Sequence, residues 1–267
     1  MLALLAHGAA TGPKLDPPDV LPPAPGGQAW KLVWHDEFDG EKLDETKWEA
    51  PEHAVRDAWW VRKAVALDGK GHLVIRTFKE GDRYCDGGVR TLGKFQHTFG
   101  FYVARMRFQK HGGHWSAFWL WNRGMREAGP EDGPLRFEVD IVERPWLDDR
   151  VEHAVHWGPL GPGAKSVGQV ARVPGVGEGW HTFAVLWTPD AYAFFVDGKE
   201  TWRPRDVVVC QLPLYILLTD EIEFKGWAGD VRKTTLPDEF LTDYVRVYDL
   251  VDAATGKPVL KPKPLAK

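Results

Sequence analysis

Residues 137–143 read Phe-Glu-Val-Asp-Ile-Val-Glu, a run of mostly β-branched apolar residues interrupted by three acids. This composition is typical of a strand inside a β-sheet. Side chains alternate between the two faces of a strand, so Glu138 and Asp140 project from one face while the aliphatic residues enter the core. Strict alternation would bury Glu143 unpaired, at high cost in free energy. We therefore predict a β-bulge between Asp140 and Glu143, which returns all three acids to one face.

The spacing of the outer acids, Glu138 and Glu143, indicates a reaction type. Their Cα atoms lie roughly 13 Å apart on a strand, and the side chains can lean together to about 5 to 6 Å. That separation suits a retaining glycosidase, whereas the inverting geometry needs roughly 6.5 to 9.5 Å. Acids this close cannot all ionise at neutral pH, so at least one pKa should be raised, as a general acid requires. The alternative is that the acids solvate an edge strand or bind a hard cation.

The rest of the chain, from Trp30 onward, also predicts strands. Short apolar and aromatic runs alternate with turn residues about every 10 positions, without a sustained helical period. Residues 192–202 carry a hairpin signal around Asp197-Gly198. Further strand patterns occupy 72–76, 99–108 and 244–248. Parallel βαβ units would need helices, so we predict an all-β fold, a sandwich of two antiparallel sheets in one domain over residues 29–251.

The flanking segments differ in composition from this body. Residues 1–28 contain six prolines after a short Leu/Ala-rich start. We interpret them as a truncated or atypical export signal followed by a Pro-rich linker, which predicts a secreted or periplasmic protein. Residues 252–267, with three prolines and four lysines, are expected to form an irregular tail.

Composition excludes several classes of function. The 267 residues carry a net charge of -4 without a basic cluster, which argues against a nucleic-acid partner. No apolar stretch approaches the roughly 20 residues of a membrane span, and we expect a monomer. Cys85 and Cys210 lack the neighbours of a zinc or thioredoxin motif, and are either a disulfide or two buried thiols. The 14 tryptophans fit an aromatic core or a surface that stacks on sugars.

Several segments together resemble glycoside hydrolase family 16, whose signature strand is E-x-D-x-x-E or E-x-D-x-E. The longer form is present at 138–143, and the similarity extends over 30–250. It includes Val-Trp-His-Asp-Glu-Phe-Asp-Gly at 33–40, His-Trp-Ser-Ala-Phe-Trp-Leu at 114–120 and Asp-Tyr-Val-Arg-Val at 243–247. The resemblance implies a concanavalin-like β-jelly roll that cleaves internal β-linkages of polysaccharides with retention.

The resemblance also implies roles for individual residues. By position, Glu138 would be the nucleophile, Asp140 its supporting acid and Glu143 the acid/base. The substrate-binding candidates are Trp115, Trp119, Trp146, His156, Trp157 and Glu221. A tryptophan in a sandwich is more often core than sugar platform, and a lone strand histidine is usually structural, so each of these has a structural alternative.

A structural calcium ion is a further implication, because many family members bind one on the convex face. The matching oxygens belong to Glu37, the Gly71 carbonyl and Asp243, and oxygen ligands from distant strands suit a hard cation. The alternative is that Glu37 and Asp243 solvate strand ends. No cofactor is expected for catalysis.

The substrate is less determined than the reaction. Laminarin-cleaving members carry an Asn-Leu-Ala-Val-Gly-Gly type segment where this chain has 215–223, which leaves the linkage open. Sulfated galactans are polyanions and favour basic clefts. The segments expected to line this cleft instead carry the acids Glu221, Glu223, Asp148 and Asp149, whose negative charge arginines offset only in part. We therefore predict a β-1,3- or mixed-linkage β-glucanase. The alternatives are a galactan hydrolase of the agarase or carrageenase type and a non-catalytic lectin.

Overall fold

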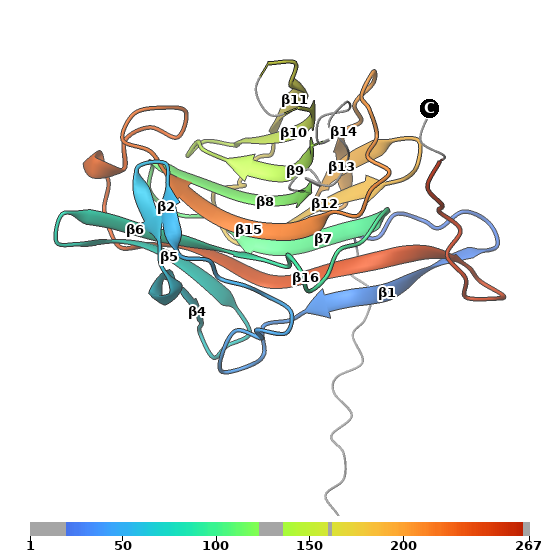
Figure 1. Cartoon of the computed structure of the whole chain (residues 1–267), viewed down its shortest axis with the longest axis horizontal. Coiled ribbons are helices and arrows are strands. Elements are labelled where there is room, and N and C mark those ends of the chain that lie inside the picture. The colour runs from blue at the N-terminus through green and yellow to red at the C-terminus, as the bar shows by residue number, and fades with distance from the viewer. Residues whose placement is uncertain (1–19, 123–135, 160–161, 264–267) are drawn as a thin grey trace, which may run out of the picture.

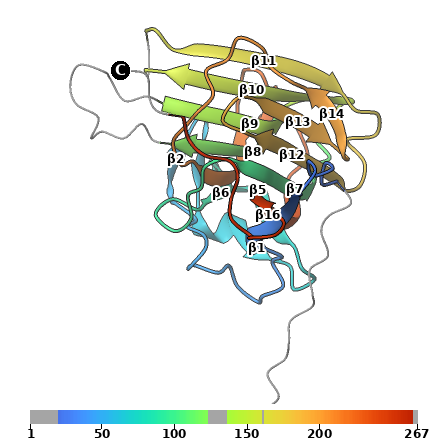
Figure 2. The same ribbon diagram turned by 90° about the vertical axis from the view of Figure 1, so that its right-hand side faces the viewer.

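The computed structural model describes residues 20–122, 136–159 and 162–263, which form two curved β-layers packed face to face (Figures 1 and 2). The first layer consists, in spatial order, of β11 (Lys165–Arg172), β10 (Arg150–Gly158), β9 (Arg136–Arg144), β8 (His114–Asn122), β15 (Tyr215–Ile222) and β6 (Arg83–Arg90). The second consists of β5 (Leu73–Glu80), β16 (Asp238–Asp252), β7 (Gly100–Arg107), β12 (His181–Trp187), β13 (Tyr192–Val196) and β14 (Lys199–Trp202). Pairing of β5 with β6 joins the layers, so the predicted antiparallel sandwich is confirmed.

Four short or peripheral strands complete the sheet. β1 (Gln28–Asp36) pairs with β16, and β4 (Val65–Leu67) pairs with β5. β2 (His53–Val55) and β3 (Ala58–Trp60) form a hairpin whose second strand runs parallel to β6. The tip of this hairpin reaches the concave side of the first layer.

The core lies between the two layers and follows the expected alternation. Phe118 and Val139 enter it from β8 and β9, and Val185 and Val245 enter the same cluster from β12 and β16. All four side chains are fully buried, and each such burial contributes about 1.5 to 3 kcal/mol to folding. The opposite faces of β8 and β9 are therefore free to carry polar side chains on the concave surface.

Two local predictions can be compared directly with the structure. The hairpin between β13 and β14 is confirmed: Asp197 and Gly198 have φ of 48° and 73°, the left-handed values of a tight hairpin turn. Cys85 and Cys210 are both buried free thiols, so the disulfide alternative is not realised. No helix among the described residues is long and apolar enough to cross a membrane.

Parts of the flanking segments pack against the body. Val20 and Leu21 contact the cluster that includes Phe101, and the Trp30 indole donates a 2.7 Å hydrogen bond to the Pro22 carbonyl. Residues 20–27 are therefore not a free linker. Residues 1–19, which hold the start of the expected signal and linker segment, lie outside the described residues. The tail from 253 to 263 consists of turns and irregular segments, and Leu260 contacts the main core.

Candidate active site

The predicted bulge in the acidic strand is confirmed. Along the β8 ladder, Phe118 pairs with Val142 and Trp119 with Asp140, which leaves Ile141 without a partner. The β10 ladder shifts register at the same place. Ile141 and Val142 are both fully buried in the core, because the extra residue turns the strand by one position.

The bulge places the three acids in one row on the concave face. Glu138 lies opposite Trp121 and His156, Asp140 opposite Trp119, and Glu143 opposite Ala117. All three line a cleft of about 240 Å³. The other lining residues come from the β2–β3 hairpin, β8, β9 and β15, namely Arg56, Trp115, Ala117, Trp119, Trp121, Arg136, Thr219 and Glu221.

Each acid has its own polar partner. Arg136 Nη2 lies 2.6 Å from Glu138 Oε2, and the Trp115 indole donates a 2.6 Å hydrogen bond to Glu143 Oε1. His156 Nε2 lies 3.1 Å from Asp140 Oδ2 and 4.0 Å from Glu138 Oε1. The ligand atoms of Glu138, Asp140 and His156 are close enough to hold a metal ion, but arginine already neutralises Glu138 and we assign no metal here.

Burial in the cleft raises the pKa of two of the three acids. Burial raises the pKa of Asp140 well above its usual range, and the nearby charge of Glu138 adds to this shift, which Arg136 opposes. Burial likewise raises the pKa of Glu143, with a smaller contribution from Asp140, while the hydrogen bond from Trp115 lowers it. Glu143 therefore remains protonated above the pH at which an ordinary glutamate ionises, as a general acid must.

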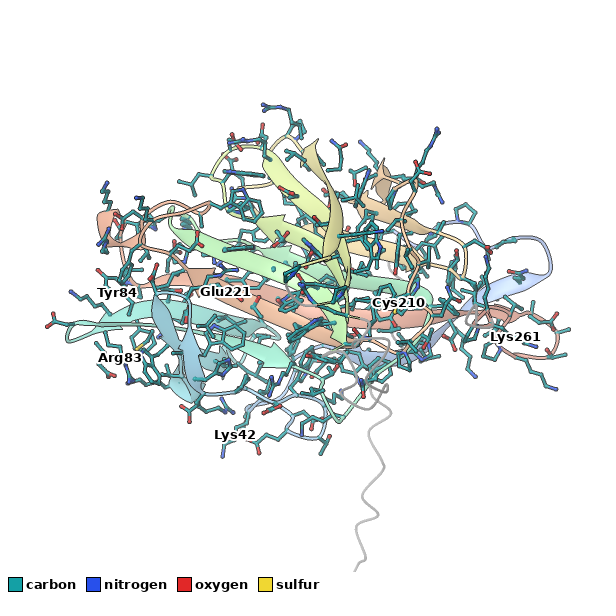
Figure 3. All side chains as sticks on the ribbon, turned by 45° about the horizontal axis from the view of Figure 1, so that its top comes forward. Lys42, Arg83, Tyr84, Cys210, Glu221 and Lys261 are labelled. Carbon is teal, nitrogen blue, oxygen red and sulfur yellow. The ribbon has the colours of Figure 1, made fainter. Side chains whose placement is uncertain are left out.

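Three substrate-binding candidates, Trp115, Trp119 and Glu221, line the cleft. The Trp119 indole donates a 3.1 Å hydrogen bond to Thr219 Oγ1, and its ring lies beside Trp121 with centroids 5.6 Å apart. Glu221 lies beside the β2–β3 hairpin (Figure 3) and forms an ion pair with Arg56. Burial raises the pKa of Glu221, and Arg56 opposes that shift.

The three remaining substrate-binding candidates lie in different places relative to the cleft. His156 faces the acids, as expected. Trp157 is the next residue on the same strand, so it points the other way; it pairs with Phe137 and packs against the core. The expectation that Trp157 is a sugar platform is therefore wrong. Trp146 lies outside the cleft lining, and the guanidinium of Arg150 covers its ring at 4.4 Å.

Sequence reasoning missed five cleft residues, namely Arg56, Ala117, Trp121, Arg136 and Thr219. Trp121 and Arg136 are each two positions from a predicted site residue, on the same strand and face as Trp119 and Glu138, so the period-two pattern could have found them. Arg56 is at the hairpin tip, 165 residues from its partner Glu221, and no local pattern marks it.

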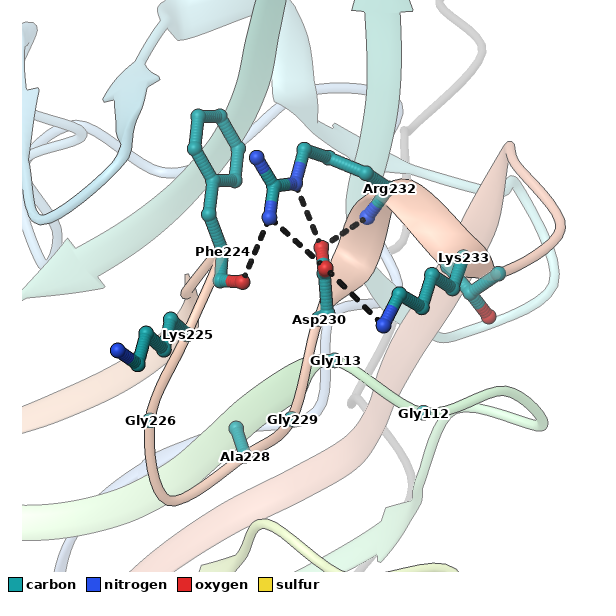
Figure 4. A pocket seen from close by; sticks show the side chains of 11 residues that line it. Gly112, Gly113, Phe224, Lys225, Gly226, Ala228, Gly229, Asp230, Arg232 and Lys233 are labelled. Atoms are coloured by element: carbon teal, nitrogen blue, oxygen red, sulfur yellow. Dashed lines mark hydrogen bonds and ion pairs between the residues drawn. The ribbon is translucent and has the colours of Figure 1, made fainter.

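A larger hollow of about 650 Å³ lies beyond the cleft, within the loop of residues 224–234 (Figure 4). Arg232 forms two hydrogen bonds of 2.8 and 2.9 Å to Asp230 and a third to the Phe224 carbonyl, so its guanidinium is already bound. Asp230 is the only acid among the described residues that line this hollow. The cleft above β9, although smaller, is therefore the candidate active site.

The expected calcium ligands do not fit the ion. Both carboxylate oxygens of Glu37 receive 2.8 Å hydrogen bonds from Arg246, and Asp243 receives one of 2.6 Å from Arg105. Calcium requires about six to eight oxygens at short range. Arginine instead neutralises both carboxylates, and we derive no role for a calcium ion from this set.

Removal of divalent cations tests this conclusion. We expect the thermal midpoint of unfolding to be the same in excess EDTA and in excess calcium, because ion pairs already satisfy Glu37 and Asp243. A resident ion at 100 times its Kd would instead raise the midpoint by roughly 5 °C or more. Differential scanning calorimetry distinguishes these outcomes, and a midpoint that falls in EDTA would restore the calcium site.

The chain is similar in sequence and in fold to known proteins. The family model for glycosyl hydrolases family 16 matches residues 53–246. The chain is 28% identical to a keratan-sulfate endo-1,4-beta-galactosidase of Sphingobacterium multivorum, over 83% of this chain and 56% of that protein, so it spans about half of that relative's length. It is also 28% identical to a beta-glucanase of Rhodothermus marinus, over 84% of this chain and 86% of the relative. Among solved structures, an endo-beta-1,3-glucanase from Pyrococcus furiosus matches with a TM-score of 0.71 at 25% identity, covering 85% of this chain and 97% of the other.

Proposed function

The chain belongs to family 16 of the glycosyl hydrolases, and from this membership we propose that it is an endo-acting β-glycan hydrolase that works with retention. The observation that carries the proposal is the bulge, which sets Glu138, Asp140 and Glu143 side by side in one cleft. Strict alternation of side chains along β9 would have buried one of the two outer acids in the core. A lectin has no need for that arrangement, so we rank the non-catalytic alternative below the enzyme.

The contacts of the acids suit two displacements. In the first, Glu138 forms a bond to the anomeric carbon while the glycosidic bond breaks, and Glu143 gives its proton to the leaving oxygen. In the second, water attacks the anomeric carbon, passes a proton to Glu143 and releases Glu138. Arg136 holds Glu138 Oε2, which leaves the other oxygen to attack.

A neutral β-glucan is our first substrate, in a β-1,3- or mixed linkage. The two arginines of the cleft do not make it basic, because Arg136 is paired with Glu138 and Arg56 with Glu221 and Glu223. The rings of Trp119 and Trp121 form an aromatic surface beside the acids, which suits the apolar face of a pyranose. A β-galactan is the second candidate, favoured by the galactosidase among the relatives.

The setting of the reaction follows from its substrate. A polysaccharide does not cross a lipid membrane, so we propose that the enzyme is secreted or periplasmic. A cleft formed within a single chain also needs no second copy, which keeps the monomer as our prediction.

The proposal is tested with a panel of polymers: laminarin, barley mixed-linkage glucan, agarose, κ-carrageenan and keratan sulfate. We expect new reducing ends together with an early fall in viscosity on one glucan, because an endo-acting enzyme cuts inside the chain. Proton NMR of the first product should show the β-anomer before mutarotation. Cleavage of a galactan alone would replace the glucan with the second candidate, and an α-anomer would contradict retention.

A further inference from the structure

The Trp115 side chain contacts Arg56, Trp227 and Glu143 at the same time, and this suggests a role other than sugar binding. We propose that Trp115 is a positioning residue, whose indole Nε1 orients the carboxyl of Glu143 while Arg56 and Trp227 hold the indole. The inference rests on the proposed role of Glu143 as the acid/base. It assigns to Trp115 a function that differs from the sugar platform expected from the sequence.

The hydrogen bond from Trp115 specifies one oxygen of the acid. The indole donates to Glu143 Oε1 at 2.6 Å, and an indole N–H can only donate. Oε1 therefore accepts, and because the carbonyl oxygen of a neutral carboxyl is a stronger acceptor than its hydroxyl oxygen, this hydrogen bond favours the proton on Oε2. Orientation of that proton toward the cleft is what transfer to a glycosidic oxygen requires.

Two neighbouring side chains, Arg56 and Trp227, pack against the indole of Trp115. The guanidinium of Arg56 lies 3.8 Å above the ring of Trp115, and ion pairs with Glu221 and Glu223 hold Arg56 in place. Trp227 packs edge-on against the same ring, with centroids 4.7 Å apart at 84°. A pyranose could stack on the covered face only by displacing Arg56 from two carboxylates.

The loop that carries Trp227 is itself fixed. Gly113 approaches it so closely that an added Cβ would lie 2.5 Å from the Val231 backbone, and the φ of Gly113 is 90°. The amide of Gly113 donates a 2.9 Å hydrogen bond to the Ala228 carbonyl. At the hairpin, Asp57 accepts a 2.8 Å bond from the Phe224 amide at the start of the same loop. The hairpin and the loop thus clamp Trp115 together.

The charged groups around Glu143 are distinct from this clamp. Asp140 lies on the same strand, and Glu152 and His156 face Glu143 from β10. Trp115 is uncharged, so its replacement by phenylalanine leaves those charges unchanged and removes only the donor. The hydrogen bond favours the ionised carboxylate, and its loss must shift the equilibrium toward the protonated acid.

The experiment compares Trp115→Phe with Trp119→Phe, the same substitution on the same strand and face. In Trp119 the indole donates to Thr219 instead of an acid. Carbon-13 NMR titration of labelled glutamate carboxyls, with Glu143→Gln to assign the resonance, measures the pKa of Glu143 without a substrate. We expect it to rise in Trp115→Phe and to be unchanged in Trp119→Phe. On a cleaved polymer, kcat should fall about tenfold in Trp115→Phe, with the alkaline limb of its pH profile moved upward.

Trp227→Leu is the second variant, because it loosens the packing against the ring of Trp115 without altering any charge or the indole N–H of Trp115. We expect the Glu143 pKa to move in the same direction by a smaller amount. Equal Glu143 titration in wild type, Trp115→Phe and Trp227→Leu would overturn the proposal. If the Glu143 titration shifts in the variants but the wild type cleaves none of the polymers, the hydrogen bond from Trp115 to Glu143 is supported and the proposed hydrolase function is contradicted.

Discussion

Glu138→Gln is expected to abolish turnover while the protein stays folded and still binds its polysaccharide. The amide has nearly the same shape as the carboxylate but cannot form the glycosyl–enzyme bond, so the first displacement has no nucleophile. We expect kcat to fall by at least about 10³-fold, equivalent to about 4 kcal/mol of transition-state stabilisation. Reducing-end release measures turnover, and affinity electrophoresis in a gel containing the cleaved polymer measures binding.

The matched control is Glu80→Gln, the same change at an exposed ion pair with Lys63 on β5. A surface pair of this kind contributes little to stability, so its activity should equal that of the wild type. Activity of Glu138→Gln within a few-fold of the control would remove Glu138 from the mechanism. Loss of binding as well as turnover would instead indicate that the ion pair with Arg136 organises the cleft.

The bulge could be predicted because two strong constraints conflict within seven residues. The period-two rule fixes the faces of a strand, and the cost of burying a carboxylate excludes one outcome of that rule at Glu143. Only an added residue satisfies both, and the structure places it at Ile141. The same rule also excludes Trp157 from the cleft, since Trp157 directly follows His156 and its side chain lies on the opposite face of the strand. The prediction for Trp157 relied on its being a tryptophan and neglected this alternation.

Other parts of the site could not be predicted, because they depend on which distant segments the tertiary fold brings together. Arg56 reaches Trp115 only because the β2–β3 hairpin folds over the first layer, and nothing near position 56 encodes that distance. Trp227 lies in an irregular loop, where sequence patterns carry little information. The pairing of two expected calcium ligands with arginine depends on the tertiary fold in the same way. Arg246 and Arg105 are visible in the sequence, but their pairing with Glu37 and Asp243 is set by how the strands cross the convex face.

Glu143→Ala should lose activity on polysaccharide by about 10²- to 10⁴-fold, because a sugar leaving group needs a proton that alanine cannot give. An activated glycoside with the β-configuration, such as a β-glycosyl fluoride of the cleaved glucan, needs no such proton and should still form the covalent intermediate. Hydrolysis of that intermediate is then slow, since no base activates the water. Azide requires no base, so its addition should accelerate turnover and yield a β-glycosyl azide.

The configuration of the azide product distinguishes the two glutamates. In Glu143→Ala azide attacks the glycosyl–enzyme formed by Glu138, and two inversions at the anomeric carbon give the β-product. In Glu138→Ala azide can occupy the space of the missing carboxylate and attack the fluoride directly, and a single inversion gives the α-product. Proton NMR of the anomeric signal identifies each product. An α-azide from Glu143→Ala would exchange the two roles, and the hydrogen bond from Trp115 would then act on the nucleophile.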